Sequence, residues 1–417
     1  MRTKLERIQK DIERLAVFNA NPGNGLTRLS FTEEHKKAQD YIISQMEDAG
    51  LSVRVDACGT IIGRLEGEDS TAACVMTGSH FDSVRCGGNF DGQAGVAAAL
   101  ETARVFKDEK IRPVRPVEFI AMIEEEGTRF GSGLFASRAM TGKVTAEELA
   151  ENKDADGIST GEAMRAFGLE PSEYKAAVRK KGEIQNFLEL HIEQGPILEA
   201  AGVDVGIVET IVGIQELEII IKGRPDHAGT TPMDMRADAM LAASKVAVTA
   251  NEAAVAAGEG TVATVGKLEI KPGSFNIVPG EVDFFIDIRS KKQVCIDKVR
   301  DAVTARLDAL IAENSGLTYE LKIMLETLPV DTDGSVCSLF EQNAESLGFS
   351  SRRMLSGAGH DAMVMANITD IGLIFVQSKG GRSHCPDEWT DYALLQKGAE
   401  VLCKTVESLA CGKVGIR

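Results

Sequence analysis

The chain has 417 residues, of which 43% are hydrophobic and 26% charged, and its formal net charge at pH 7 is −17. Because domains usually contain roughly 100–200 residues, this length favours two domains. The negative charge argues against a nucleic-acid partner, since phosphate binding normally needs a basic surface. No run of about 18 apolar residues occurs, so no membrane span is expected.

The first residues, MRTKLERIQKDIERLAVF, mix charged and apolar side chains at helical spacing. They lack the apolar segment and cleavage site of a signal peptide, so a cytoplasmic location is expected. The 8 cysteines form no CxxC pair. In a chain of this length we expect reduced thiols without a catalytic role.

Helical and strand patterns alternate along the next part of the chain. Residues 31–50 are expected to form a helix that ends near Gly50, and residues 51–67 alternate like strands. Four later apolar runs, each followed by polar residues, are expected to be strands: 72–82, 117–127, 186–195 and 371–384. With helices such as 92–109 between them, they predict an α/β fold with a central mixed sheet flanked by helices. Ligands of such sheets gather beyond the carboxyl ends of the strands, so the four ends should meet at one place.

Residues 212–326 have a different pattern, which indicates one sheet packed against two helices. The earlier pattern resumes after this block. We therefore expect residues 1–211 and 327–417 to form a metal-binding catalytic domain, and residues 212–326 to form an inserted α+β sandwich.

The histidines are the first indication of chemistry. Five of the 6 lie in glycine-rich or acid-rich sequences near expected strand ends: His80, His191, His227, His360 and His384. One such histidine is more often structural than a ligand, but several together with carboxylates suit zinc, manganese, cobalt or nickel. The sixth, His35, lies on an amphipathic helix and is expected to be exposed.

The glycine-rich loop after His80 contains two aspartates. Asp91 lies between Gly88 and Gly92, where tight turns can bring its carboxylate close to His80, and one carboxylate can bridge two cations. Asp82 is suited to hold the His80 imidazole through its second nitrogen; the alternative is an aspartate that caps a turn.

The run EEEG, residues 124–127, follows an apolar strand that should be buried. Neighbouring residues of an extended segment point to opposite sides. One glutamate can therefore bind a metal while its neighbour acts as general base.

Taken together, these segments resemble the family of N-carbamoyl-L-amino acid hydrolases and allantoate amidohydrolases, within the clan of dinuclear aminoacylase-like metallohydrolases. The resemblance rests on GSHFDSV, GGNFDGQAG, EEEGTRFG, ELHIEQGPILE, DHAGTTPMDMRADA, NIVPG, DIR, SGAGHDA and the final SH. It covers nearly the whole chain, from about residue 25 to the last strand.

The resemblance implies two divalent metal ions per subunit, either zinc, manganese, cobalt or nickel. One ion would be held by His80, Asp91 and His191, and the other by Asp91, Glu126 and His384. Glu125 would be the general base. For His360, a supporting role is expected rather than ligation.

The resemblance also implies a substrate pocket lined by Gln194, Gln215, Asn276, Arg289 and Gly359, with Arg289 pairing the substrate carboxylate. A guanidinium group matches a carboxylate bidentately. The alternatives are a surface salt bridge for Arg289 and turn or strand-end hydrogen bonds for Asn276 and Gln215. His227, on the inserted lid and dimerisation domain, would stabilise the oxyanion in the partner subunit's site, which requires a homodimer.

The expected reaction is hydrolysis of a linear ureido C–N bond in a small substrate that carries a carboxylate, such as an N-carbamoyl-L-amino acid or allantoate. An aminoacylase or dipeptidase of the same clan is the alternative within enzymes. A metal-free binding protein on a decayed scaffold is the alternative outside them, but all five ligands are present.

Overall fold

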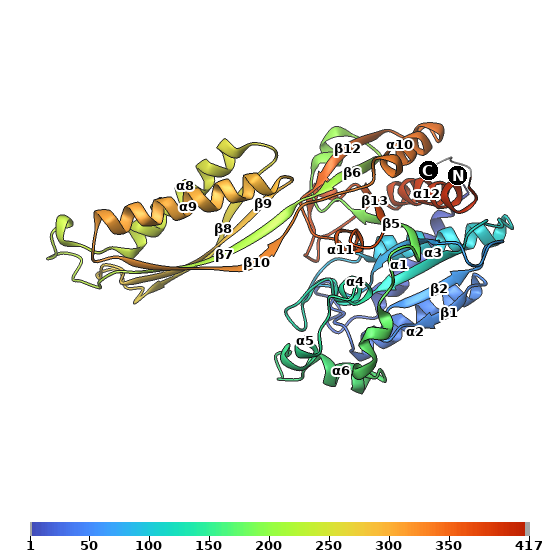
Figure 1. Cartoon of the computed structure of the whole chain (residues 1–417), viewed down its shortest axis with the longest axis horizontal. Helices are drawn as coiled ribbons and strands as arrows, with labels where there is room; N and C mark the ends of the chain where they lie inside the picture. The colour runs from blue at the N-terminus through green and yellow to red at the C-terminus, as the bar shows by residue number, and fades with distance from the viewer. Residues whose placement is uncertain (1, 413–417) are drawn as a thin grey trace. The chain divides into compact units, whose positions relative to one another are not determined.

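The structure, a computed structural model, describes residues 2–412 and divides into two compact units (Figure 1). Unit 1 runs to Glu209 and resumes at Thr332, whereas unit 2 is Thr210–Asp331. The expected insertion, residues 212–326, lies inside unit 2. Within residues 2–412, no helix combines the length and apolarity needed to cross a membrane.

A nine-stranded mixed sheet organises unit 1, and the prediction of such a sheet is confirmed. Its strand order is β1-β2-β4-β3-β5-β13-β6-β11, with β12 also paired to β6. The strands are β1 (Ser52–Val55), β2 (Ile61–Leu65), β3 (Cys74–His80), β4 (Val117–Met122), β5 (Ile184–Ile192), β6 (Val205–Ile211), β11 (Val330–Asp331), β12 (Ser351–Ser356) and β13 (Asp370–Val376).

The four strands predicted to end at one place are neighbours in this sheet. β3 pairs in parallel with β4 and with β5, and β13 pairs in parallel with β5. Every residue of β3 and β4 is buried, as expected for parallel strands that are covered on both faces. The carboxyl ends of all four strands therefore lie along one edge of the sheet.

Helices flank this sheet. α1, α3 and α12 contact one another, and α3 and α12 pack on β3 and β5; α11 packs on β5 and β13. The helices are α1 (Leu5–Val17), α2 (Glu33–Asp48), α3 (Gln93–Asp108), α4 (Phe135–Met140), α5 (Ala146–Glu151), α6 (Thr160–Phe167), η1 (Pro171–Ala177), α7 (Ile197–Ala201), α10 (Gly334–Ser346), α11 (Asp361–Met365), η3 (Lys379–Gly381) and α12 (Tyr392–Ala410).

Unit 2 is a four-stranded antiparallel sheet with two long helices. The strand order is β10-β7-β9-β8, and α8 and α9 pack on this sheet. Alternate residues of β9, from Val282 to Ile288, are buried in the core with the helices. The elements are β7 (Gly213–Lys222), η2 (Met233–Met235), α8 (Ala239–Ala257), β8 (Val262–Lys271), β9 (Glu281–Ser290), α9 (Gln293–Glu313) and β10 (Thr318–Thr327).

His35 is not exposed, so that expectation was wrong. Its exposed fraction is 2%, and its ring stacks on Phe167 and meets Phe81 edge-on. Its Nδ1 accepts a hydrogen bond from the Phe31 backbone at 2.6 Å. Burial lowers the pKa of His35 to about 3, so the ring is neutral.

Candidate metal centre

The sheet places two histidines directly. His80 is the last residue of β3, and His191 lies one residue before the end of the neighbouring strand β5. Both are buried, with 1% and 2% of their surface exposed. Because both strands run the same way, their imidazole rings meet at one edge of the sheet, with centroids 5.8 Å apart.

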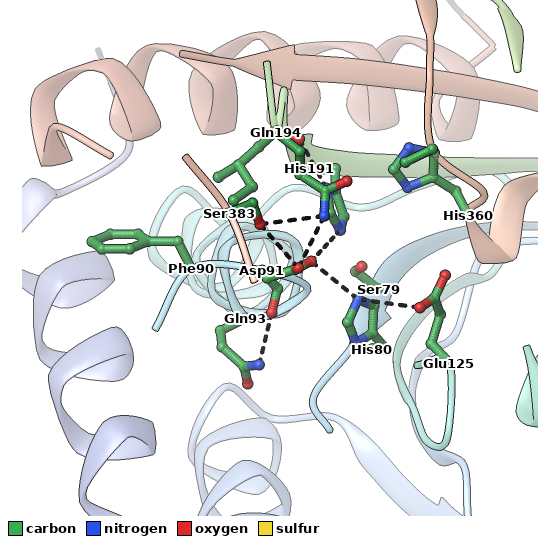
Figure 2. A network of polar contacts seen from close by, with 12 residues as sticks. Ser79, His80, Phe90, Asp91, Gln93, Glu125, His191, Gln194, His360 and Ser383 are labelled. Carbon is green, nitrogen blue, oxygen red and sulfur yellow. Dashed lines mark hydrogen bonds and ion pairs between the residues drawn. The ribbon is translucent and has the colours of Figure 1, made fainter. Parts of the chain in front are cut away.

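Asp91 and His384 come from loops. Asp91 precedes α3, and His384 follows η3 with a left-handed φ of 55°. Asp91 Oδ1 lies 3.1 Å from His191 Nε2 and 3.6 Å from His80 Nε2. Its Oδ2 lies 3.0 Å from His384 Nε2 (Figure 2 shows Asp91 between the two strand histidines). The Asp91 carboxylate thus presents Oδ1 to the two strand histidines and Oδ2 to His384.

Ligand atoms in this region form three groups that could each hold a metal ion. The groups are His80, Asp91 and His191; Asp91, Glu126 and His384; and His80, Glu125 and Glu126. In each group the candidate atoms lie within 4.8 Å of one another. The first two groups coincide with the two ligand sets implied by the resemblance.

The histidines turn Nε2 toward Asp91. His191 Nδ1 lies 2.9 Å from the carbonyl oxygen of Ile192, an acceptor, so Nδ1 carries the proton and Nε2 has a free lone pair. His80 Nδ1 faces Asp82 Oδ1 at 3.5 Å. Asp82 thus lies on the side of His80 expected from the sequence, at a distance longer than a normal hydrogen bond.

Asp82 has a second role that the sequence did not indicate. Its two carboxylate oxygens accept hydrogen bonds from the backbone of Glu125 and Glu126, each at 3.2 Å. It therefore joins the end of β3 to the acidic segment after β4. This contact fixes where both glutamate side chains begin.

Burial and mutual repulsion act on these carboxyl groups. Burial, and then the charge of Asp91, raises the pKa of Glu126 to about 7. Burial, and then the neighbouring carboxylates Glu126 and Asp361, also raises the pKa of Glu125. Such a concentration of buried acid is unfavourable unless positive charge accompanies it.

The donor set fits divalent cations. Among the described residues, Glu126 Oε1 is buried without a hydrogen-bond partner. Nitrogen and oxygen ligands of this kind suit several divalent ions, and a bound cation would lower the carboxyl pKa values again. The residues present therefore match a metal centre rather than a metal-free binding cavity.

Three further residues predicted for this region lie at different distances from the ligands. Gln194 Nε2 donates to Asp91 Oδ2 at 3.0 Å, so Gln194 lies beside the ligands. His360 belongs to none of the three ligand groups; its Nε2 pairs with the Ser356 hydroxyl at 2.8 Å, and its ring meets His191 edge-on. Burial, and then His191, lowers the pKa of His360, so it packs as a neutral ring. Gly359 is half-buried directly before it.

The other candidates belong to unit 2. His227 and Asn276 are exposed, and their segments are paired: His227 bridges Ile277, and the Ala228 backbone donates to Asn276 O at 3.0 Å. His227 Nδ1 accepts hydrogen bonds from the backbone of Gly229 at 3.0 Å and of Thr230 at 3.3 Å. Its proton is therefore on Nε2, which is left as a donor.

Gln215 and Arg289 lie on opposite faces of the unit 2 sheet. Gln215 pairs with Ile288, faces the interior with 0% exposed, and donates to Glu326 at 2.7 Å. Arg289 pairs with Ile214 on the outer face, where Asp287 accepts from its Nε at 2.8 Å. Gln215 is therefore enclosed in the interior of unit 2, whereas Arg289 lies on the outer face of the sheet.

Sequence reasoning missed several buried polar residues around the ligands. Gln93 Nε2 donates to the carbonyls of Asp82 and Asp91 at 3.1 and 2.7 Å, and its Oε1 accepts from the fully buried Arg28 (Figure 2 shows the Gln93–Asp91 contact). Glu388 contacts the same loop, where its Oε1 accepts hydrogen bonds from the backbone of Phe90 and Asp91. A polar residue at the first position of an otherwise apolar helix, as in GQAGVAAAL, is the one sequence signal for Gln93.

A buried carboxylate between two histidine groups, at the carboxyl ends of parallel strands, is the arrangement of a hydrolase that uses divalent metal ions. The profile of Peptidase family M20/M25/M40 matches residues 76–408, and the chain belongs to this family of metal-dependent hydrolases.

Relatives of known name cover almost the whole chain. An N-carbamoyl-L-amino-acid amidohydrolase from Paenarthrobacter aurescens is 45% identical over 98% of both chains. An allantoate amidohydrolase from Bacillus subtilis is 34% identical over 96% of both. The crystal structure of a hydantoinase/carbamoylase-family amidase from Burkholderia multivorans has a TM-score of 0.91 and 34% identity, with 98% of each chain covered. These relatives confirm the resemblance drawn from the motifs.

Proposed function

We propose that this protein hydrolyses the ureido C–N bond of N-carbamoyl-L-amino acids, with two divalent ions per subunit and Glu125 as general base. The observation that carries the proposal is Asp91, whose two oxygens face two different ligand groups. The 45% identity to an N-carbamoyl-L-amino-acid amidohydrolase supports this substrate class over allantoate.

His80, Asp91 and His191 would hold one ion, and Asp91, Glu126 and His384 the other. When bound, the ions would polarise the substrate carbonyl and lower the pKa of the attacking water. Zinc, manganese, cobalt and nickel all suit these ligands.

Glu125 moves the proton in this proposal. Its Oε2 lies 4.0 Å from His80 Nε2, so the carboxylate faces the ligands, while Asp82 fixes its backbone. Glu125 takes a proton from the attacking water and delivers it to the leaving nitrogen. Ammonia leaves, and the carbamate formed breaks down to carbon dioxide and the free amino acid.

Unit 2 would supply substrate recognition as a lid and dimerisation domain. Arg289 would bind the substrate carboxylate, oriented by Asp287, and Asn276 would add a polar contact. Gln215, which the strand turns inward, would not touch the substrate directly. His227 would donate a hydrogen bond from its Nε2–H to the developing oxyanion in the partner subunit's site. These roles rest on the motif resemblance and on the tautomer of His227.

The test is a turnover screen of the metal-loaded enzyme in which both released ammonia and the free amino acid are measured, because dipeptides and N-acetyl amino acids release no ammonia. Substrates would be a series of N-carbamoyl-L-amino acids, their D enantiomers, ureidopropionate, allantoate, N-acetyl amino acids and dipeptides. Turnover confined to the L-carbamoyl series is expected. Efficient hydrolysis of dipeptides or N-acetyl amino acids, with none of carbamoyl substrates, would refute the proposal in favour of a dipeptidase or aminoacylase.

A further inference from the structure

The four histidine and aspartate ligands differ in how they are held. His80 and His191 lie within strands, so the sheet fixes their backbone. Asp91 and His384 lie in loops that are distant in sequence and outside the named strands; the Asp91 loop has one isolated bridge, from Gly87 to Leu26. A metal centre needs its ligands held to within fractions of an ångström, so some contact between these two loops must fix one relative to the other.

Glu388 contacts both loops. Its Oε1 accepts hydrogen bonds from the backbone of Phe90 at 2.9 Å and of Asp91 at 3.0 Å. Its Oε2 accepts from the hydroxyl of Ser383, the residue before His384, at 2.6 Å. The side chain is buried, with 4% exposed. One carboxylate thus joins the backbone of one ligand to the neighbour of another.

We propose that Glu388 is a positioning residue that holds the Asp91 and His384 loops in register for metal binding. This inference rests on the proposed dinuclear site. Among the described residues, Glu388 belongs to none of the candidate ligand groups. Both of its oxygens already accept hydrogen bonds from loop donors, which matches support of ligands rather than ligation.

The loop before Asp91 is built around this carboxylate. A Cβ atom on Gly88 would lie 2.1 Å from Glu388 Oε1 and 2.3 Å from its Cβ. Glycine is therefore needed at position 88 for space, since any side chain there would push the loop away from Glu388. The requirement is reciprocal, because it exists only while Glu388 occupies its observed position.

An aromatic contact joins the same two segments. The ring of Phe90 meets Trp389 edge-on at 5.2 Å and lies 5.6 Å from Tyr392. The segment that carries Glu388 is itself tied down, because Lys379 N donates to Trp389 O at 2.9 Å. The backbone next to Glu388 is therefore fixed by a hydrogen bond, and its side chain can hold the two loops in place.

The two metal positions should depend on Glu388 unequally. The ion held by His80 and His191 draws two ligands from strands, whereas the ion held by Glu126 and His384 depends on Asp91 and His384, both in the loops that Glu388 joins. Loss of a residue that supports ligands typically weakens metal binding by about 10–100-fold. We expect this loss mainly at the second position.

The experiment titrates chelator-stripped, full-length protein with Co²⁺ and follows d–d absorption, so that affinity is read without activity. Wild-type protein should bind two equivalents; a single equivalent would refute the proposed dinuclear site and this inference with it. If wild type binds two, Glu388→Ala should retain the first and weaken the second about 10–100-fold. Glu388→Gln, which keeps an oxygen for the two backbone donors, should recover most of the affinity.

Asp56→Asn is the matched control. Asp56 is also a buried carboxylate whose Oδ1 accepts from two backbone donors, Cys58 and Thr60, each at 2.9 Å, but it serves the turn between β1 and β2. The Asp56→Asn protein should bind two equivalents of Co²⁺, as the wild-type protein does. If Glu388→Ala does not fold, Gly88→Ala, which displaces the same carboxylate, should weaken the second equivalent. Unchanged binding in a folded Glu388→Ala or Gly88→Ala protein, or equal losses in Asp56→Asn, would overturn the proposal.

Discussion

The candidate metal ligands of unit 1 and the candidate substrate residues of unit 2 are held in opposite ways. His80, His191 and Asp91 are buried and in mutual contact. His227 and Asn276 are exposed, and their side chains are hydrogen-bonded to near neighbours in sequence: His227 Nδ1 accepts from the backbone of Gly229, and Asn276 Oδ1 accepts from the Ser274 hydroxyl. Buried carboxylates are stable in their charged form only beside positive charge, whereas an exposed polar side chain is already solvated. A bound cation would therefore stabilise the buried ligand cluster of unit 1. The exposed candidate residues of unit 2 would gain no such stabilisation.

Substitutions that act on metal content should consequently map to unit 1. The largest effect is expected for Asp91→Ala, because this carboxylate faces both ligand groups. The variant should lose both metals and all measurable turnover, as elemental analysis and ammonia release would show. His384→Ala serves as comparison and should keep a partly occupied first position. Two full metals in Asp91→Ala would contradict the bridging role.

Within unit 1, the neighbouring glutamates should separate base from ligand. Glu125→Gln keeps the shape but cannot accept the proton, so turnover should fall about 10²–10⁴-fold with metal content unchanged. Glu126→Gln should instead weaken metal binding. Elemental analysis beside kinetics distinguishes the two, and near-normal turnover of Glu125→Gln would refute its assignment.

In unit 2, His227→Ala should reduce turnover about 10²–10³-fold while leaving metal content intact, because it removes an oxyanion donor. Arg289→Ala should fail separately through lost recognition of the carboxylate. Elemental analysis and kinetics measure both. If either variant lost metal, the contrast between the two units would fail.

Mixing these two inactive variants tests the shared site. If subunits exchange, each heterodimer contains one site with both residues intact, and activity should return to about half the wild-type rate per heterodimer. Proven exchange without recovery would place both residues in the same site. An active monomer would exclude sharing altogether.

The smallest effect is expected for Gly359→Ala. Within residues 2–412, the added Cβ would meet only Met363 Sδ, at 3.5 Å, and the glycine has no left-handed φ. The fold should tolerate the change, and kcat/KM should fall about 10–200-fold for bulky substrates if Gly359 lines the pocket. Thermal unfolding and kinetics with short and long substrate side chains measure this.

Gly92→Ala is the contrasting substitution to Gly359→Ala, because position 92 lies against a candidate metal ligand. Gly92 has a φ of 68°, and a Cβ there would lie 2.5 Å from His80 Cε1. This variant should lose metal, unlike Gly359→Ala. Equal metal contents in the two variants would show that the ring of His80 is less constrained than its surroundings indicate.

The strands and their meeting point could be predicted because long apolar runs followed by polar residues specify both. Glu388 could not, since its partners at Phe90 and Asp91 are 298 and 297 residues away in sequence. His35 was mispredicted because helical periodicity shows which face a residue occupies, but not that Phe81 and Phe167 cover that face. Gln215 illustrates the same limit: a motif match does not reveal that its strand turns it inward.

The exposure of His384 has a practical consequence. Its side chain is 51% exposed, whereas those of His80 and His191 are 2% exposed. Solvent and small chelators therefore reach the His384 side of the candidate centre first, and the two proposed ions should exchange at different rates. Protein purified through chelating media should carry a mixed population, with one position full and the other fractional. Reproducible specific activity will then depend on the metal added back to the assay as much as on the protein itself.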